Sequence, residues 1–531
     1  RHSAVGRPPW IGEDDMKRRD FLKGTAGITG AGLVLGNLPV FSAFAQSETP
    51  TSCGTLIWGH SETTQNIDIH QTGTASTLRL LQNVHDSIIT VDSDFKLQPS
   101  LAETFEESAD GLTYTFRLRP NVKFHNGKAV TSADVKYSFE RVKNPDTGAV
   151  NFEVFNDVAE ILTPDELTVI VKMSGVNAPF LGRLAELGAG VVLPEGSGET
   201  QGTQPIGAGP FKFISREFGN EVQLERFDDY WQEPAYVDKI ISREVTEPTV
   251  RLTGLRTGEM HIINDLPLDR VDQLKKDGEF QISTWFPLSW AFLNFNHKRE
   301  PYNDPRVRRA FDHMIDKKVL VQGALWGQGE VTASPSFPNS ASRNESLKVR
   351  PQDFDKARSL LKDAGFGPGD LEFVFKVTTN YPWHIEAAQI LQEWFREGGL
   401  KVDVQQLTWS DWLSQVWVDR DFDVSMMNFF TLWEPDFLYY SLWHSTGAFN
   451  YRNVNDPTLD GLAEQARVTV DKAARNEIYH QIQQRIHDES HDVILWYRNG
   501  TLGAQQNVGG MDKLVHPNGS NLNFRHVWLK A

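Results

Sequence analysis

The sequence has a single cysteine, Cys53, among its 531 residues. An intrachain disulfide is therefore impossible, and there is no C-x-x-C motif for a metal or redox site. Basic residues are also scarce, because 53 Lys and Arg stand against 70 Asp and Glu, which gives a formal net charge of −17. A nucleic-acid-binding protein would show a basic patch, so we expect no nucleic-acid partner.

The short motifs of common enzymes are absent as well. The chain contains no G-x-S-x-G, no Walker loop and no G-x-G-x-x-G after a strand. His487 and His491 have the i,i+4 spacing of a helical metal site, but the glutamate of HE-x-x-H is missing, and a solvated helix end is the competing interpretation. We expect a protein that is not an enzyme and that has no cofactor. A secreted hydrolase or metal-dependent enzyme is the alternative.

Residues 24–46 carry no charge, and no other stretch approaches a membrane span. This run follows Met16-Lys17-Arg18-Arg19 and ends at Ala43-Phe44-Ala45, an A-x-A cleavage site. The pattern predicts an upstream extension and twin-arginine signal over residues 1–45, and hence export to the periplasm. A transmembrane anchor is the alternative, but the many glycines and Pro39 argue against it.

The richest local pattern lies in residues 101–142. Tyr114, Phe116 and Leu118 alternate with polar residues, which predicts a half-buried strand. Residues 122–125 suggest a short second strand, followed by an Asn-Gly turn. Thr131 or Ser132 can then cap a helix that carries an acidic residue in its first turn. On these grounds alone the window is an ordinary β-β-α unit.

The same window, DGLTYTFRLRPNVKFHNGKAVTSADVKYSFERV at residues 110–142, resembles the signature region of the family 5 extracellular solute-binding proteins. Further matches follow in the family's order, including PIGAGPF at 205–211, DPRVRRA at 304–310 and NDP at 455–457. The matches extend from about Thr55 to Arg498. The resemblance implies a periplasmic receptor of an ABC importer that captures a peptide-like, opine-like or oligosaccharide solute by cleft closure. It also implies membrane permease partners and a monomer, with a nickel-chelate receptor as a further alternative.

The chain is too long for one compact core, and strand-like and helical runs alternate along it. We expect an α/β fold with mixed sheets, with a single helix from Pro305 to Gln322 among its elements. The resemblance implies two lobes around a cleft, a hinge and an extra inserted domain. We place lobe one at 54–84, 205–286 and 500–531, the inserted domain at 85–204, and lobe two at 287–499. The hinge is expected at 286–289 and 496–499.

The resemblance also suggests where a ligand binds. Peptide-binding relatives carry W-x-x-D-x-x-DP, whose first aspartate pairs with the ligand's α-ammonium, and the matching position here is Thr431. A threonine cannot neutralise an ammonium group, which argues against a plain peptide ligand. Glu434 or Asp436 could replace the lost carboxylate, or both could merely cap the following loop and helix. The complete set of predicted ligand contacts, each with a core or surface alternative, is Trp433, Glu434, Asp436, Trp290, Trp409, Trp412, His444 and Ser61.

Overall fold

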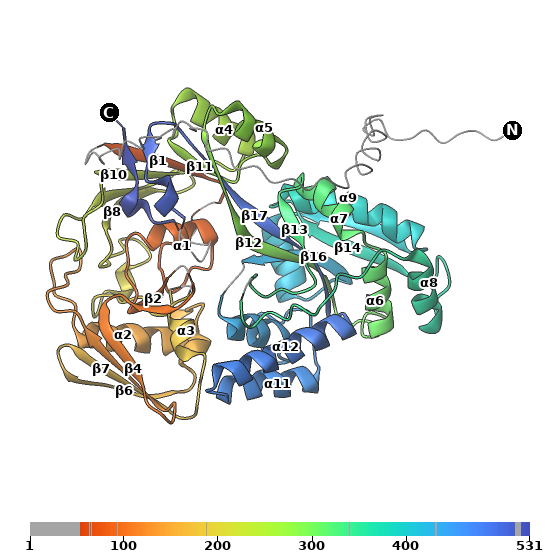
Figure 1. The fold of residues 1–531 in the computed structure, drawn as a ribbon, viewed down its shortest axis with the longest axis horizontal. Coiled ribbons are helices and arrows are strands. Elements are labelled where there is room, and N and C mark those ends of the chain that lie inside the picture. The colour runs from red at the N-terminus through yellow and green to blue at the C-terminus, as the bar shows by residue number, and fades with distance from the viewer. Residues whose placement is uncertain are drawn as a thin grey trace, which may run out of the picture. The chain divides into compact units, whose positions relative to one another are not determined.

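A computed structural model describes residues 54–62, 64, 66–92, 94–186, 188–338, 340–430, 433–515 and 522–530. The predicted signal, Cys53 and Thr431 lie outside the described residues. The main body is built on an 11-stranded mixed sheet with the strand order β15-β14-β16-β12-β17-β11-β1-β10-β9-β8, in which β13 also pairs with β17 (Figure 1).

The strands of this sheet fall into two groups on either side of the long pair β12 and β17. We call the group with β1 the first lobe and the group with β14 the second lobe. The first lobe contains β1 (Thr55–His60), β8 (Phe211–Glu217), β9 (Glu221–Arg226), β10 (Lys239–Glu244) and β11 (Ile262–Asn264). The second lobe contains β14 (Glu372–Thr378), β15 (Lys401–Leu407) and β16 (Val424–Phe430), while the short β13 (Gly329–Val331) pairs with β17.

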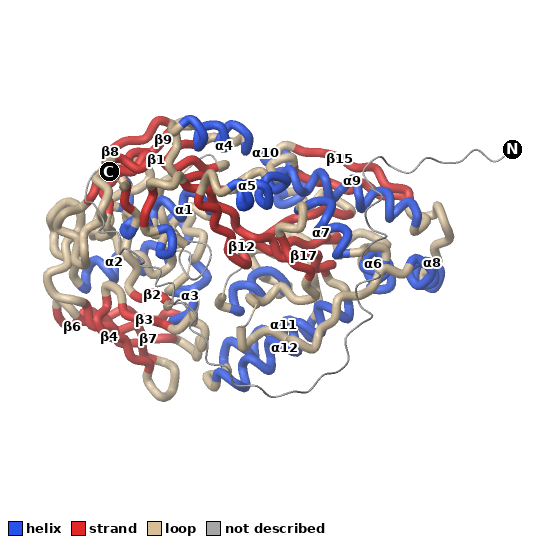
Figure 2. Tube along the Cα trace, turned by 45° about the horizontal axis from the view of Figure 1, so that its top comes forward, coloured by secondary structure: helices blue, strands red, loops and turns tan. Residues whose placement is uncertain are grey.

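The two lobes share β12 (Gln281–Phe295) and β17 (Asp492–Ala504), which cross the middle of the molecule side by side (Figures 1 and 2). The two strands are antiparallel, and their pairing has a register shift between Trp285 and Ser289. The part of β12 before this shift pairs with β17 next to the first lobe, and the part after it also pairs with β16. Both lobes are therefore tied together through one continuous pair of strands.

A separate four-stranded sheet has the order β4-β5-β7-β6, and we call it the inserted sheet. Its strands are β4 (Ala102–Glu107), β5 (Thr113–Leu118), β6 (Val158–Asp165) and β7 (Thr168–Met173). Two small hairpins complete the strands: β2 (Ile89–Val91) with β3 (Leu97–Pro99), and β18 (Val508–Gly509) with β19 (Trp528–Leu529).

Helices cover the sheets of both lobes (Figure 2). None of the described helices has the length and apolarity needed to cross a bilayer. The described α-helices are α1 (Ala75–Leu81), α2 (Ser132–Lys143), α3 (Phe180–Leu184), α4 (Pro248–Thr257), α5 (Val271–Asp277), α6 (Pro305–His313), α7 (Lys317–Leu325), α8 (Phe354–Asp363), α9 (Pro382–Glu397), α10 (Trp409–Trp412), α11 (Pro457–Val468) and α12 (Lys472–Glu489).

The 101–142 window behaves largely as its pattern predicts. Tyr114, Phe116 and Leu118 of β5 are buried. Thr131 and Asp134 form a capping box at the start of α2, in which the Asp134 carboxylate accepts from the Thr131 amide at 2.8 Å. The prediction of a second strand over 122–125 is wrong, because only an isolated bridge between Lys123 and Ala129 forms there.

The single helix predicted from Pro305 to Gln322 is also wrong. The structure has two helices, α6 and α7, with a break after Met314. Asp316 causes the break, because its carboxylate accepts from the amides of Lys318 and Val319 at 3.0 Å each and so caps a new helix. The two helices pack onto the second lobe's sheet.

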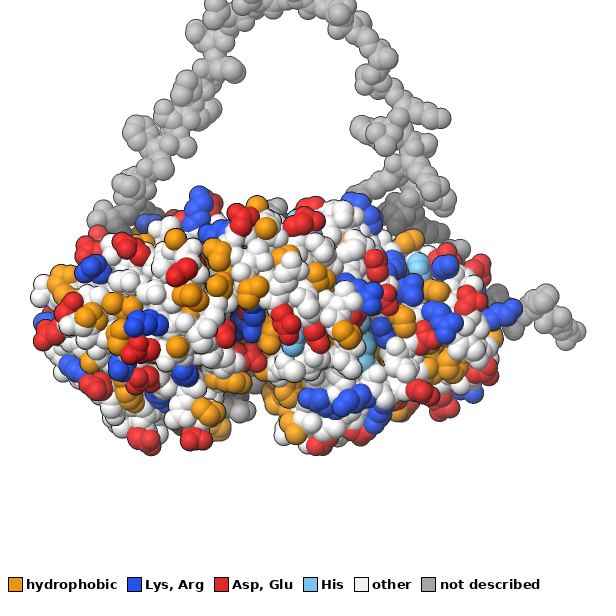
Figure 3. Space-filling model, turned by 90° about the horizontal axis from the view of Figure 1, so that it is seen from below, with side chains coloured by type: hydrophobic (Ala, Val, Ile, Leu, Met, Phe, Trp, Pro, Cys, Tyr) orange, Lys and Arg blue, Asp and Glu red, His pale blue; other side chains and the backbone are white. Residues whose placement is uncertain are grey.

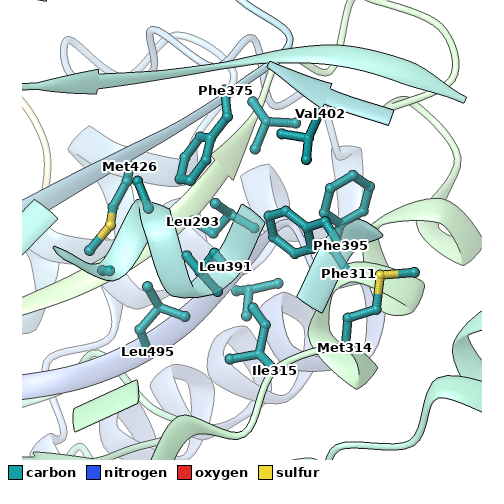
Figure 4. Close-up of a cluster of buried hydrophobic side chains, with 14 of the residues drawn as sticks. Leu293, Phe311, Met314, Ile315, Phe375, Leu391, Phe395, Val402, Met426 and Leu495 are labelled. Atoms are coloured by element: carbon teal, nitrogen blue, oxygen red, sulfur yellow. The ribbon is translucent and has the colours of Figure 1, made fainter. Parts of the chain in front are cut away.

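The largest core lies in the second lobe, between its sheet and helices α6, α7 and α9 (Figure 4). Phe375 and Met426 project from the sheet, while Phe311, Leu391 and Phe395 project from the helices. Separate apolar clusters fill the inserted sheet and the first lobe. On the face shown in Figure 3, acidic and basic side chains are interspersed without a large patch of one sign.

Candidate functional site

In the first lobe, three parallel strands end at the same edge. β1 runs parallel to both β10 and β11, so their carboxyl ends lie together. His60 and Ser61 are at the end of β1, and Asp265 follows β11. The Ser61 hydroxyl donates to the Asp265 carboxylate at 3.2 Å. The carboxyl ends of parallel strands are where α/β sheets bind ligands.

The second lobe repeats this arrangement. β14 runs parallel to β15 and β16, so the segments after these strands leave from one edge. Tyr381 and Trp383 follow β14, Trp409 follows β15, and Trp433 follows β16. The Tyr381 ring lies 5.3 Å from the Trp383 ring and 6.2 Å from the Trp409 ring, measured between centroids. These aromatic rings form a wall at the strand ends.

Arg498 of β17 contacts both sets of strand ends. Its two terminal nitrogens each lie 3.3 Å from Asp265 Oδ1 of the first lobe. Its guanidinium also lies 4.3 Å from the centroid of the Trp383 ring of the second lobe. The side chain is almost fully buried, and its Nε has no hydrogen-bond partner among the described residues. Buried donors without a partner are rare in folded proteins, so this side chain is a candidate for ligand contact.

Positive charge predominates around Arg498. Arg79 and Arg251 also act on Asp265, and burial lowers the pKa of both guanidinium groups. Burial alone would raise the pKa of Asp265, but the three arginines outweigh burial and hold it below its usual value. Glu62 is the other carboxylate that interacts with Arg79. Glu247 acts on Arg251 as well, but Asp265 is the carboxylate on which all three guanidinium groups act, which favours an anionic ligand beside them.

The histidine at this edge is uncharged. Burial, together with Arg251 and Arg79, lowers the pKa of His60 to about 3. Its Nε2 pairs with the Ser242 hydroxyl at 2.9 Å. The neutral imidazole thus adds no further positive charge at the end of β1.

The predicted segment 433–436 contacts the turn between β2 and β3 and the end of α3. Trp433 stacks on Phe95 with ring centroids 6.4 Å apart, and its indole Nε1 is buried without a partner among the described residues. Glu434 and Asp436 are both buried. The Asp436 carboxylate accepts from Arg183 at 2.9 Å and from Arg467 at 2.8 and 2.9 Å, so its charge is already matched within the protein.

The other predicted contacts are divided between the edge and the core. Ser61 and Trp409 lie at the strand ends. Trp290 and Trp412 are fully buried in an aromatic cluster of the second lobe, where the Trp412 indole donates to Ser425 at 3.0 Å. His444 stacks on Tyr440, next to the acidic side chains of α11. Whether these residues touch a ligand stays a prediction.

Sequence reasoning missed Arg498, Asp265, Arg79 and Tyr381 as site residues. Arg498 and Asp265 are 233 positions apart, so no local motif joins them. The signal that could have found Tyr381 is its position just after the strand-like run that became β14. The same rule would have selected Trp383, which the sequence offered only as one of many tryptophans.

The histidine pair considered for metal binding is split by the fold. α12 ends at Glu489, and His491 turns to Asp456, with Nε2 2.9 Å from Oδ2. His487 instead contacts the backbone oxygen of Lys348 at 3.1 Å. Within the described ranges no cluster of three or more His, Cys, Asp or Glu could hold a metal.

Comparison with known proteins identifies the family. Residues 96–450 match the model of the bacterial extracellular solute-binding proteins, family 5. The chain belongs to this family. The function predicted from the sequence, that of a substrate-binding protein of an ABC importer, is confirmed over the enzyme alternative, because family members bind solutes.

Similar proteins agree with this assignment and with the predicted two-lobed α/β fold. The glutathione-binding protein GsiB of Pectobacterium atrosepticum is 26% identical over 79% of this chain and 84% of its own. The oligopeptide-binding protein AppA of Bacillus subtilis is 26% identical over 92% of this chain and 94% of its own. The periplasmic binding protein AgaA of A. tumefaciens R10, solved with agropinic acid, has a TM-score of 0.80 and 27% identity, covering 90% of this chain and 99% of AgaA.

Proposed function

We propose that this family 5 solute-binding protein captures a small solute that carries a carboxylate, and that it holds the solute between the strand ends of its two lobes. Arg498 carries the proposal, because one buried guanidinium contacts both lobes and its Nε has no partner in the described part of the chain. A guanidinium fork matches a carboxylate better than any other side chain does. The aromatic wall of Tyr381, Trp383 and Trp409 would pack against the apolar part of the solute.

The charge of the site favours some ligands of relatives over others. Glutathione and agropinic acid, the ligands named for GsiB and AgaA, both carry carboxylates. The arginine excess around Asp265 suits such acids and gives no advantage to a neutral oligosaccharide. Among the solutes predicted from the sequence, opine-like and peptide-like acids are therefore preferred.

The capture step would be a closure of the lobes around β12 and β17. These are the strands that both lobes share, and their pairing is irregular between Trp285 and Ser289. Strand segments that absorb a change in backbone angles serve as hinges in domain closure. We propose the hinge at 286–289 and 496–499, with the domain boundaries predicted above. Delivery to a membrane permease, a monomeric state and export by the twin-arginine signal belong to the same proposal.

A thermal-shift screen of the mature protein tests the ligand class. The probes are glutathione, agropinic acid, a tripeptide, the same tripeptide with an amidated carboxyl end, a neutral oligosaccharide and a nickel–histidine chelate. A ligand at 100 times its Kd stabilises the folded state by about 2.7 kcal/mol. We expect an acid to raise Tm and the amidated tripeptide to raise it less than its parent acid. Stabilisation by the oligosaccharide alone would refute the carboxylate proposal.

A further inference from the structure

The contact between segment 433–436 and the end of α3 is unusually polar for a buried contact. The Glu186 carboxylate accepts from the backbone amides of Trp433 and Glu434 at 3.0 Å each. Asp436 binds Arg183 from the same turn of chain as Glu186. Glu186, Glu434 and Asp436 are at most 7% exposed, so three carboxyl groups are buried together.

This contact joins two separately packed bodies. α3 packs into the apolar core of the inserted sheet. Segment 433–436 leads into Leu438 and Tyr439, which pack with α11 and α12 in the second lobe. In Figure 1, α3 and α11 face each other across the boundary between these bodies. The contact therefore forms only when the inserted sheet and the second lobe come together.

The Glu434 carboxylate occupies the space beside the backbone of Gly182. A Cβ at Gly182 would overlap the Glu434 carboxylate. Glu434 thus lies directly against α3, and its charge acts on Glu186. Glu186 Oε2 is buried and has no hydrogen-bond partner among the described residues. An ionised carboxylate with an unpartnered oxygen in such a place is costly, and protonation lowers this cost because it removes the buried charge.

The neighbouring charges do not remove this cost. Arg183 and Arg467 both bind Asp436, and Arg467 also interacts with Glu153. Arg183 also acts on Glu186 and Glu434, and the further cation near Glu434 is Arg475 of α12, which is half-buried. The neighbouring Tyr479 is neutral. Burial raises the pKa of Glu186 to about 8, although two backbone amides oppose the shift, and it raises the pKa of Glu434 to about 7, although Arg475 opposes the shift.

We propose that Glu186 and Glu434 form a proton-dependent latch, in which a carboxyl group takes up a proton when the inserted sheet and the second lobe close on each other. The latch also positions Trp433, because Glu186 holds its backbone amide. It rests on the proposed function only in that this closure is taken to accompany solute capture.

The sign of the pH dependence follows from linkage. In the open state both side chains face water and have ordinary pKa values near 4.3. The closed state raises those values, so closing is favoured below them and weakens as the pH rises through about 7 to 8. For one proton bound with a pKa of about 7 or higher, the closing equilibrium falls by about tenfold or more from pH 6 to pH 8.5.

Closure can be measured without any solute. Spin labels at E103C on β4 and Q465C on α11, in a C53S background, report the distance between the two bodies by pulsed electron resonance. We expect a short-distance population at pH 6 that falls about tenfold relative to the open population at pH 8.5. In E186Q/E434Q the amides can keep the same acceptor bonds but cannot titrate, so the short-distance population should stay constant with pH. E106Q, an exposed position on β4, should behave like the parent protein.

Three results would overturn the latch. They are an absent short-distance population at pH 6, a parent protein whose distances do not change with pH, or an E186Q/E434Q variant that loses closure at pH 8.5 as the parent does. Circular dichroism of each variant shows whether it is folded. Because no solute is present, a failed ligand screen would refute the proposed function and leave this result unaffected.

Discussion

Replacing Arg498 with lysine tests the ligand site most directly. R498K keeps one positive charge but loses the planar fork and most of the stacking on Trp383. A hydrogen bond to a charged group contributes about 1.5–3 kcal/mol. If Arg498 binds the solute's carboxylate through its fork, this range corresponds to an affinity loss of about 10- to 150-fold.

The contacts of Arg498 within the protein show how much of the expected R498K effect falls on ligand affinity. The Asp265 contacts of Arg498 are long, at 3.3 Å, so little of the expected loss comes from that pair. The Trp383 contact contributes about 0.5–2 kcal/mol and is partly retained by an ammonium group. Most of the loss should therefore fall on ligand affinity rather than on the stability of the free protein.

Calorimetric titration with glutathione and agropinic acid measures the affinity of the parent and R498K proteins. R243K on β10 is the matched control, because Arg243 is 35% exposed and forms only a loose 3.6 Å pair with Glu221. We expect R243K to bind within twofold of the parent protein. If R498K binds an acid within threefold of the parent while remaining folded, the assignment of Arg498 as the carboxylate anchor is wrong.

Two further predictions concern segment 433–436 and the second lobe's core. W433A should weaken solute binding at least tenfold, about 1.4 kcal/mol, in the same titration, because it removes a half-buried ring beside Phe95. The exposed control W326A should have no such effect, and equal losses in both would refute the role of Trp433. D492N should lower the free energy of unfolding in urea by about 3–5 kcal/mol, since it leaves the fully buried Arg452, now 2.8 Å from Asp492 Oδ2, without a counter-charge. D228N, which removes a pair in which the carboxylate is 78% exposed, should cost at most about 1 kcal/mol, and a D492N loss as small as that would contradict the argument.

The sequence predicted the parts of the fold that depend on local pattern. The period-2 alternation of β5 and the capping box of α2 are readable because each involves residues a few positions apart. The break between α6 and α7 was missed although Asp316 is itself a helix-capping residue type. Apolar residues continue on both sides of it, so periodicity alone did not reveal the break.

Site residues were harder to predict because they depend on long-range pairing. Trp290 and Trp409 look alike in the sequence, yet the first is in the core and the second lies at a strand end. The difference arises from which strands are parallel, and a tryptophan count carries no such information. Likewise, the spacing of His487 and His491 suggested a metal site, but α12 ends between them and His491 pairs with the Asp456 carboxylate.

The predicted loss of a ligand-pairing carboxylate at residue 431 and the arginines around Asp265 both favour a solute with net negative charge. Peptide-binding relatives are expected to place an aspartate where this chain has Thr431. Asp436 already forms ion pairs with Arg183 and Arg467. No free carboxylate of segment 433–436 is therefore left for an ammonium group at neutral pH, since Glu434 lies against Glu186. At the opposite side of the site, Arg498 keeps a donor that has no partner among the residues the structure describes. The preferred solute should accordingly carry more negative than positive charge, as an opine-like acid does and a zwitterionic neutral peptide does not.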